Sequence, residues 1–207
     1  SFSSVSAFSF FANKNLTAGE GGMVVTNNKK YYDKCRYLRN MSYSLTKDRT
    51  YEHDEIGFNY RMTNLQAAIG LAQTELADKY RSMRIENNRF YKKFLSGVKG
   101  IIFQQDEKNS INVHWMNAIL IDEKKYGKTK DRLMKFLKEN NVDTRLLFTG
   151  MHKQKSLKQY GCKITGNYKN TEKLTKSGLY LPSSSNLKTT QIEYVCNLIK
   201  KFLKTGN

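Results

Sequence analysis

Apolar and polar stretches alternate along the first part of the chain in a pattern that predicts two strands joined by a turn. Residues 5–11 and 23–26 are short apolar runs rich in Val and Phe, and this composition favours β-strands. The Gly21-Gly22 pair ahead of the second run allows a tight reversal of the chain. We therefore expect a buried strand at 5–11, a polar turn at 12–21 and a second short strand at 23–26.

Helical spacing appears twice before residue 97. Asn27 or Asn28 is positioned to cap a helix that runs to about Asn40. Residues 42–62 predict a long loop, and loops of that length are usually functional or disordered. Thr63 is the expected N-cap of a helix in which Leu65, Ile69, Ala72, Leu76, Tyr80 and Met83 form one apolar side. The pattern continues less regularly to residue 96, which leaves open one long helix or a break near Ser82.

Strand and helix patterns alternate after Gly97. Residues 101–104, 113–121 and 142–148 predict strands, and residues 180–182 predict a short extended piece. Helices are expected at 128–140, at 167–177 and after a capping box formed by Thr190 and Glu193. The last helix would bury Ile192, Val195, Ile199 and Phe202. This alternation is typical of a small α/β domain, so we expect two domains, at 1–96 and 97–207.

Composition narrows the class of protein. An apolar fraction of 39% and an aromatic fraction of 12% favour a packed core over disorder. No apolar run is long enough to cross a bilayer, and no secretory signal pattern is present. Cys35, Cys162 and Cys196 are far apart, odd in number and without metal-site spacing. We therefore expect a reducing, cytoplasmic setting, with neither a metal site nor a membrane contact.

The net charge of +18 raises the question of an acidic partner. Strongly basic proteins bind nucleic acid, anionic membranes or phosphate-bearing ligands. The lysines are spread over the whole chain, mostly on expected helix faces, and we find no cluster of Lys and Arg with aromatic platforms. A lysine-rich solvated surface is thus favoured over a nucleic-acid-binding module, although charge alone does not separate these cases.

The polar turn between the first two expected strands contains the candidate for covalent chemistry, Lys14. Glycines at 19, 21 and 22 allow the backbone to approach a ligand closely. An amine held against apolar walls loses solvation, which disfavours the ammonium form and leaves a nucleophile suited to Schiff-base chemistry. The plain alternative is a solvated lysine in a turn, which is what most lysines are.

Two sequence blocks resemble the DegT family of sugar-nucleotide aminotransferases, which are fold-type-I pyridoxal-phosphate enzymes. The first holds Phe8-Ser9-Phe10, Asn13-Lys14, Leu16-Thr17 and Gly19-Glu20-Gly21-Gly22, and the second is the block from Gly57 to Gly70. Weaker similarity continues through Thr144-Arg145, residues 148–152 and residues 181–183. The resemblance implies an α/β fold: the C-terminal portion of a fold-type-I transferase, with a partial large domain and a small α/β C-terminal domain.

The resemblance also implies roles for the first block. The lysine that matches Lys14 carries pyridoxal phosphate in this family and later moves a proton as general acid and base. The serine that matches Ser9 donates a hydrogen bond to the cofactor phosphate, a use that suits a hydroxyl group. A strand serine on a polar edge is the plain alternative for Ser9.

Three further residues are assigned by the same resemblance. Asn59 lies in the block that, in this family, reaches across a dimer interface toward the neighbour's cofactor phosphate. Arg61, in the same block, would grip a phosphate or carboxylate of the substrate, with a structural ion pair equally open. His152 matches a substrate-side histidine, although Gly150 and Met151 stand where the family has Pro-Leu, and a structural histidine is the more common alternative. Tyr60 and the loop at 43–51 are further candidates for contact with the sugar or the nucleotide.

The implied reaction is transfer of an amino group, from glutamate, to a nucleotide-linked 4-keto-6-deoxy sugar for polysaccharide or glycan synthesis. In this family the acidic partner of the pyridine nitrogen, the aromatic that stacks on the ring and the phosphate-binding backbone lie upstream of the lysine, and the chain has no room for them before Lys14. We therefore expect the chain to be the C-terminal part of an enzyme, inactive alone and a homodimer with shared active sites at full length.

Two alternatives within the family stay open at this point. A dehydratase that works from pyridoxamine phosphate would have histidine in place of Lys14, so the lysine disfavours it. A catalytically inactive regulatory or binding protein that retains the aminotransferase fold is compatible with the sequence, although the presence of Lys14 and Ser9 argues mildly against it.

Overall fold

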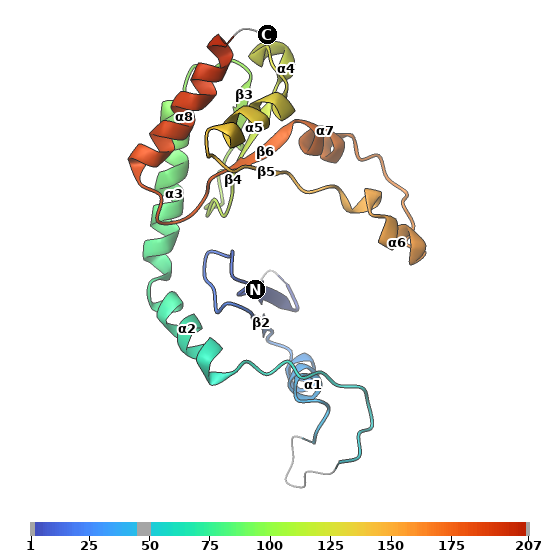
Figure 1. Cartoon of the computed structure of the whole chain (residues 1–207). Helices are drawn as coiled ribbons and strands as arrows, with labels where there is room; N and C mark the ends of the chain where they lie inside the picture. Colours follow the sequence, from blue (N-terminus) through green and yellow to red (C-terminus); the bar gives the residue numbers. More distant parts are fainter. Residues whose placement is uncertain (1–2, 45–50, 206–207) are drawn as a thin grey trace. The chain divides into compact units, whose positions relative to one another are not determined.

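A computed structural model describes residues 3–44 and 51–205 (Figure 1). The chain forms two compact units, Ser1–Tyr80 and Arg81–Asn207, which we call the N-terminal and C-terminal units and describe one at a time. The domain boundary predicted between residues 96 and 97 stays a prediction. Residues 45–50 of the candidate loop at 43–51 lie outside the described residues.

The N-terminal unit consists of a β-hairpin and helices whose caps the sequence predicted. Strands β1 (Ser6–Ser9) and β2 (Gly22–Val25) pair antiparallel, from Ser6 opposite Val25 to Ser9 opposite Gly22. Helix α1 (Lys29–Arg39) begins after Asn28, whose Oδ1 accepts a bond of 2.9 Å from Lys30 N. Helix α2 (Asn64–Glu75) begins after Thr63. Asn28 and Thr63 are therefore the caps, as expected.

The expectation of a buried apolar stripe in this unit is wrong for the described residues. Strand β1 is shorter than 5–11 and its apolar side chains are exposed, while the exposed fraction of Leu65 on α2 is 81%. Ala18 is the one hydrophobic residue buried among those described in this unit. Apolar spacing indicates which face is suited to burial, but within the N-terminal unit these side chains stay exposed.

The helical pattern after Thr63 breaks at Leu76. Helix α2 ends at Glu75, and helix α3 (Ala77–Phe94) follows directly. Leu76 has a non-helical backbone conformation, and its N–H bonds to Gln73 O at 3.2 Å rather than continuing the regular ladder. The two open possibilities, one long helix or a break near Ser82, are thus replaced by a break six residues earlier.

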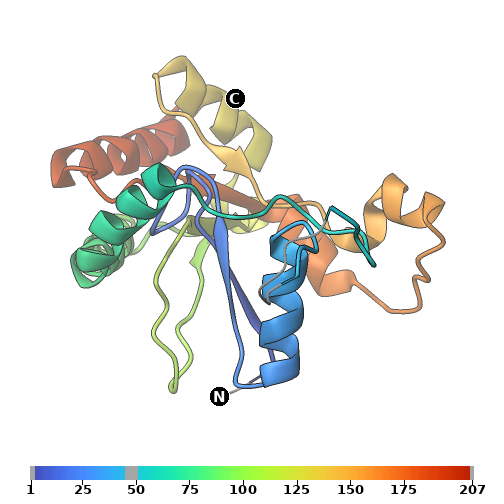
Figure 2. The same cartoon turned by 90° about the horizontal axis from the view of Figure 1, so that it is seen from below.

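The C-terminal unit is an antiparallel sheet with helices, as the alternating pattern predicted. Its elements after α3 are β3 (Ile101–Phe103), β4 (Asn117–Ile121), α4 (Glu123–Tyr126), α5 (Lys130–Glu139), β5 (Arg145–Leu146), η1 (Met151–Lys153), α6 (Lys155–Gln159), α7 (Lys169–Ser177), β6 (Gly178–Leu181) and α8 (Thr189–Lys204). The strand order is β3-β4-β6-β5, and every neighbouring pair is antiparallel. Figures 1 and 2 show α5 and α8 packed together, with α6 projecting away from the sheet.

The core of this unit lies between one face of the sheet and helices α3, α5 and α8. Ile119 and Leu179 are cross-strand partners on that face, and both are fully buried. The predicted stripe on α8 is confirmed, because Ile192, Val195, Ile199 and Phe202 all belong to the core. Burying such a side chain stabilises the fold by about 1.5–3 kcal/mol, so this cluster is the main stabilising feature of the unit.

Some boundaries in the C-terminal unit differ from the predictions. Strand β4 begins at Asn117 rather than near 113, because His114 has a φ of 46°, outside the extended region. Strand β5 has two residues instead of the expected 142–148. The predicted capping box of Thr190 and Glu193 does not form: the N-cap is Lys188, two residues earlier, and Lys188 N donates to Gln191 Oε1 at 2.9 Å.

A row of polar side chains on α3 is buried, which the sequence did not indicate. Arg84, Asn87 and Tyr91 lie on one side of the helix and bond to the connection between β6 and α8. Asn87 Nδ2 donates to Ser184 O at 2.8 Å, and Tyr91 OH donates to Pro182 O at 3.0 Å. Backbone carbonyls of an irregular segment need such donors when they are buried, so the polar row fixes this connection.

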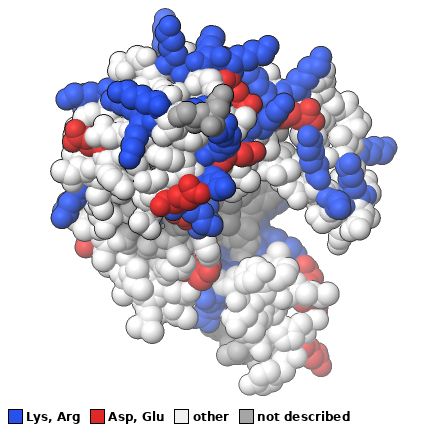
Figure 3. Space-filling view, turned by 45° about the horizontal axis from the view of Figure 1, so that its top comes forward, with Lys and Arg blue, Asp and Glu red and all other residues white. Residues whose placement is uncertain are grey.

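Charge and thiol positions complete the description. Figure 3 shows Lys and Arg side chains spread over the face in view, with fewer Asp and Glu among them.

The three cysteines are free thiols: Cys35 and Cys162 are exposed, and Cys196 is buried in the core. Burial raises the pKa of the Cys196 thiol to about 12. Across residues 3–44 and 51–205, no helix has the length and apolar character needed to span a membrane.

Candidate functional site

Lys14 lies in a turn that the backbone closes at both ends. Lys14 N donates to Phe11 O at 2.9 Å, and Ala18 N donates to Phe10 O, also at 2.9 Å. Thr17 Oγ1 donates to Phe10 O at 3.1 Å and so secures the same carbonyl. Lys14 itself is half-buried. The turn therefore has a defined backbone, and its lysine is only partly exposed to solvent.

Ser9 ends the strand that leads into this turn. It lies opposite Gly22 in the hairpin, where a Cβ would come within 2.6 Å of Phe8 O. Glycine at 22 therefore permits the close approach of the two strands beside Ser9. The Ser9 hydroxyl oxygen accepts a long bond of 3.4 Å from Phe11 N, and the residue is exposed. Its O–H is placed at the surface as a donor next to the lysine turn.

Asn59 and Arg61 are brought together by a shared neighbour, Asn40. Asn59 forms an isolated antiparallel bridge with Asn40, the residue that ends α1. Arg61 Nη1 donates to Asn40 Oδ1 at 3.3 Å. The structure therefore gives Arg61 a neutral partner, and the structural ion pair considered for it is not formed with any described residue. Most of the guanidinium donors stay available, since Arg61 is exposed.

The second sequence block also contacts the hairpin and its turn. A Cβ at Gly21 would lie 2.8 Å from the Met62 side chain, and one at Gly70 would lie 3.6 Å from Ala18 Cβ. Met62 and Gly70 therefore sit against the segment that contains Lys14. The structure thus places the two blocks in one unit with direct packing between them.

Asn15, the residue after Lys14, carries a signal that sequence reasoning missed. Its Oδ1 is buried and has no hydrogen-bond partner among the described residues. A buried acceptor without a donor is unfavourable by about 1–3 kcal/mol, so such groups usually bond to ordered water, an ion or a ligand. No spacing or composition in the sequence distinguishes this asparagine from its neighbours.

His152 belongs to the C-terminal unit and has a tight set of local contacts. Its ring stacks on Tyr168 with centroids 4.2 Å apart and an interplanar angle of 7°. Its Nε2 lies 3.5 Å from Glu172 Oε1, and Lys153 Nζ lies 3.0 Å from the same oxygen. The hydrogen bond and charge of Lys153, with a smaller contribution from His152, lower the pKa of Glu172. These contacts describe a histidine fixed in place.

The glycine before His152 explains how the ring fits. A Cβ at Gly150 would come within 2.5 Å of the His152 ring and within 2.7 Å of the Thr171 side chain. Any larger residue at 150 would displace the ring from Tyr168. Gly150, in the Gly150-Met151 pair that precedes His152, therefore leaves room for the His152 ring to stack on Tyr168.

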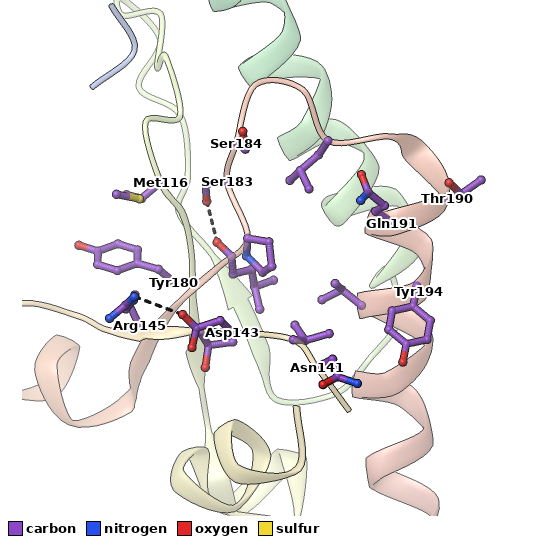
Figure 4. Close-up of a pocket in the computed structure, with 16 residues that line it drawn as sticks. Met116, Asn141, Asp143, Arg145, Tyr180, Ser183, Ser184, Thr190, Gln191 and Tyr194 are labelled. Carbon is purple, nitrogen blue, oxygen red and sulfur yellow. Dashed lines mark hydrogen bonds and ion pairs between the residues drawn. The ribbon is translucent and has the colours of Figure 1, made fainter. Parts of the chain in front are cut away.

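A groove in the C-terminal unit holds Arg145. It has a volume of about 590 Å³ and lies between residues 141–145, residues 180–184 and the first half of α8 (Figure 4). Arg145 pairs with Tyr180 across β5 and β6 and forms an ion pair of 3.2 Å with Asp143. Burial raises the pKa of Tyr180. Pockets of this size suit small molecules, and polar side chains line this one both beside Arg145 and on α8, where Gln191 and Tyr194 lie.

Comparisons with known proteins agree over nearly the full chain. A sequence model described as the DegT/DnrJ/EryC1/StrS aminotransferase family matches residues 1–200. GDP-perosamine synthase of Escherichia coli O157:H7 is 37% identical over 201 residues, which are 97% of this chain and 52% of that protein. The chain therefore spans about half the length of such relatives.

Solved structures give the same result for the fold. The structure of DesI in the presence of its TDP-sugar product superposes with a TM-score of 0.86 at 26% identity, covering 100% of this chain and 51% of that one. Helicobacter pylori PseC, an aminotransferase involved in the biosynthesis of pseudoaminic acid, gives a TM-score of 0.87 at 22% identity, covering 98% and 54%. The mixed α/β fold expected from the sequence is thereby confirmed.

Proposed function

Because the chain belongs to the DegT/DnrJ/EryC1/StrS aminotransferase family, we propose that it acts in pyridoxal-phosphate-dependent transfer of an amino group to a nucleotide-linked 4-keto-6-deoxy sugar. Glutamate is the proposed donor, and the product serves polysaccharide or glycan synthesis. The observation that carries the proposal is the backbone-closed turn that contains Lys14 and directly follows β1, the strand that ends at Ser9.

The residues of the turn fit the cofactor in chemical type. Pyridoxal phosphate needs an amine for its aldehyde and hydrogen-bond donors for its phosphate. Lys14 supplies the amine and Ser9 the hydroxyl donor, while Gly22 keeps the backbone close at that point. The buried, unpartnered Oδ1 of Asn15 indicates that a further group belongs here.

When bound, pyridoxal phosphate supplies the electron sink that amino transfer requires. The Lys14 amine would hold the cofactor and, once released by the donor amine, accept a proton at one carbon and return it at another. Ser9 Oγ would donate to the phosphate, and Asn59 would do so from a neighbouring subunit. Arg61 and His152 are the proposed contacts to the substrate, Arg61 through its open guanidinium donors.

A homodimer with shared active sites is part of the proposal. Leu65 and Ile69 on α2 are exposed apolar residues that directly follow the block containing Asn59. Such residues support an interface next to that block. The proposed setting is the cytoplasm, which suits three cysteines that are all free thiols.

Covalent trapping of the cofactor tests the assignment of Lys14. The natural protein would be incubated with pyridoxal phosphate, reduced with borohydride and mapped by peptide mass spectrometry. The phosphopyridoxyl group is expected on Lys14, and Lys14→Ala should lose both this label and the cofactor's absorbance change. Lys29→Ala is the control, because Lys29 is an exposed lysine of the same unit, paired with Asp33 at 2.7 Å. Equal labelling of Lys14→Ala and Lys29→Ala would refute the assignment.

Activity and binding assays on the same protein distinguish the aminotransferase from the catalytically inactive alternative. Cofactor on Lys14 together with glutamate-dependent amination of a nucleotide-linked keto sugar supports the aminotransferase. Cofactor or nucleotide-sugar binding without any amine transfer would favour the catalytically inactive regulatory or binding protein.

A further inference from the structure

The segment from η1 to the end of α7 carries a third of the net charge of the chain. Residues 151–177, which we call the basic lobe, contain seven lysines, one glutamate and no arginine, and seven positive charges less one negative charge give +6 of the total +18. Figures 1 and 2 show α6 and the connection to α7 projecting away from the sheet. All seven lysines are exposed: Lys153, Lys155, Lys158, Lys163, Lys169, Lys173 and Lys176.

Helix α7 arranges three of these lysines on one face. Lys169, Lys173 and Lys176 follow the i, i+4, i+7 spacing that places side chains on one side of a helix. Thr171 and Thr175 lie on the opposite side of the helix, and both are half-buried. The helix packs against β4 and β6. The face formed by the three lysines is therefore turned away from the sheet.

Among the described residues, no acidic side chain pairs with this lysine face. Glu172 lies three residues after Lys169 and four before Lys176, which is the spacing of a helical ion pair, but its Oε1 contacts Lys153 Nζ at 3.0 Å instead. Like charges four residues apart, such as Lys169 and Lys173, repel each other and disfavour the helix. An external anion against this face would remove that repulsion.

Exposed apolar side chains accompany the lysines in the basic lobe. The exposed fractions of Met151, Tyr160 and Ile164 are 67%, 90% and 41%. Peripheral membrane contacts combine lysines at the headgroups with apolar or aromatic side chains at the acyl boundary. Nucleic acids are preferentially recognised through the planar fork of arginine, which the lobe lacks. This composition favours an anionic lipid surface over nucleic acid as the partner.

We propose that the basic lobe binds the surface of a membrane that contains anionic phospholipids, with the lysine face of α7 against the headgroups. Such peripheral binding needs no spanning helix, because it combines surface charge with a few apolar side chains. It revises the expectation, drawn from the sequence, that the chain makes no membrane contact. The inference does not depend on the amino-transfer chemistry.

Sedimentation with lipid vesicles tests the proposal. The natural protein would be mixed with vesicles made of equal parts of phosphatidylglycerol and phosphatidylcholine, or of phosphatidylcholine alone. Binding is expected to the anionic vesicles only, and it should weaken as salt is added, because salt screens the charges. The triple variant Lys169→Gln, Lys173→Gln, Lys176→Gln should bind about a hundredfold more weakly, since each lysine near such a surface adds to the attraction. Glutamine is a comparable helix former, so α7 should be retained.

A second triple variant with the same loss of charge is the matched control. Lys124→Gln, Lys138→Gln, Lys201→Gln removes exposed lysines of the same unit outside the basic lobe and should bind nearly as the wild type does.

Three results would overturn the proposal. They are equal binding by the two triple variants, equal sedimentation with the two kinds of vesicle, and displacement of the protein from anionic vesicles by an equal mass of RNA, which would make nucleic acid the preferred partner. Since the readout is vesicle binding, its failure leaves the cofactor test at Lys14 unaffected.

Discussion

Arg84 donates its Nε hydrogen to Ser185 Oγ at 2.7 Å, and this bond joins α3 to a residue 101 positions later in the chain. The same guanidinium donates through Nη1 to Trp115 O at 2.8 Å and to Ser183 O. One buried cation thus connects α3, the start of β4 and the segment before α8. A planar group with several donors in fixed directions is suited to such a junction.

Removing this junction should destabilise the C-terminal unit. Arg84→Ala leaves buried carbonyl oxygens without donors, so we expect the free energy of unfolding to fall by about 3 kcal/mol. Urea unfolding followed by the fluorescence of Trp115, the one tryptophan of the chain, measures the change. Arg89→Ala is the control: Arg89 is an exposed residue of the same helix paired with Glu86 at 3.0 Å, and its loss should cost less than about 1 kcal/mol. Equal effects of the two variants would contradict the role of Arg84.

Truncation of two helical leucines should change the free energy of unfolding by very different amounts. Leu133 on α5 has no exposed surface, so Leu133→Ala should lower the free energy of unfolding by about 2–5 kcal/mol. Leu65 on α2 is mostly exposed in this chain, and Leu65→Ala should change it by less than about 0.5 kcal/mol. Urea unfolding monitored by circular dichroism compares them. A large loss for Leu65→Ala would mean that α2 is already covered.

Stability should depend on pH through His114. Burial lowers the pKa of His114, and Lys92 adds to this effect, whereas Asp106 at 3.7 Å opposes it. The folded pKa therefore lies below the unfolded value of about 6.5. Between these two values the unfolded chain binds more protons, so stability is complete above about pH 6.5 and falls as pH drops through the folded pKa.

The variant His114→Asn should flatten that dependence, because asparagine does not titrate and accepts the positive φ of 46°. Urea midpoints measured from pH 7.5 to 5 test this. An unchanged slope in His114→Asn would show that another group sets the pH dependence.

Two glycine-to-alanine changes are predicted to have opposite signs. A Cβ at Gly178 would lie 2.6 Å from Leu174 O and overlap the Leu147 side chain, so Gly178→Ala should destabilise the sheet by about 1–3 kcal/mol. A Cβ at Gly70 meets Ala18 at an ordinary 3.6 Å inside α2, so Gly70→Ala should stabilise that helix by about 0.5–1 kcal/mol. Amide hydrogen exchange of β6 and α2 reports each effect separately.

The sequence predicted features well where local spacing and residue type decide them. The apolar stripe on α8 in the C-terminal unit was placed correctly, as was the cap Thr63 in the N-terminal unit, and Asn28 is the cap of the two candidates, Asn27 and Asn28. Leu65 shows the limit of this reasoning: its spacing indicates a face built for burial, but spacing does not say which polypeptide covers that face.

The sequence could not predict which polar residues are buried, and the reason is different. Arg84 and Asn87 look like ordinary solvent-facing helix residues, since their partners are backbone carbonyls nearly a hundred positions away. The same holds for Asn15: its Oδ1 is buried without a hydrogen-bond donor among the described residues, and local sequence does not indicate this. For Lys14 and Ser9 the sequence motif indicated the pair, and their roles stay predictions; the structure places Ser9 at the end of β1 and Lys14 in the turn that follows.

Because Cys196 is buried in the core, its rate of alkylation reports how often α8 separates from the rest of the C-terminal unit. A thiol with a pKa of about 12 and no exposed surface is almost wholly un-ionised at neutral pH, so an alkylating reagent reaches it only when α8 leaves the core. Cys35 and Cys162 are exposed and should be modified at once. The delay before the third modification would then time the release of the last helix in the untouched natural sequence.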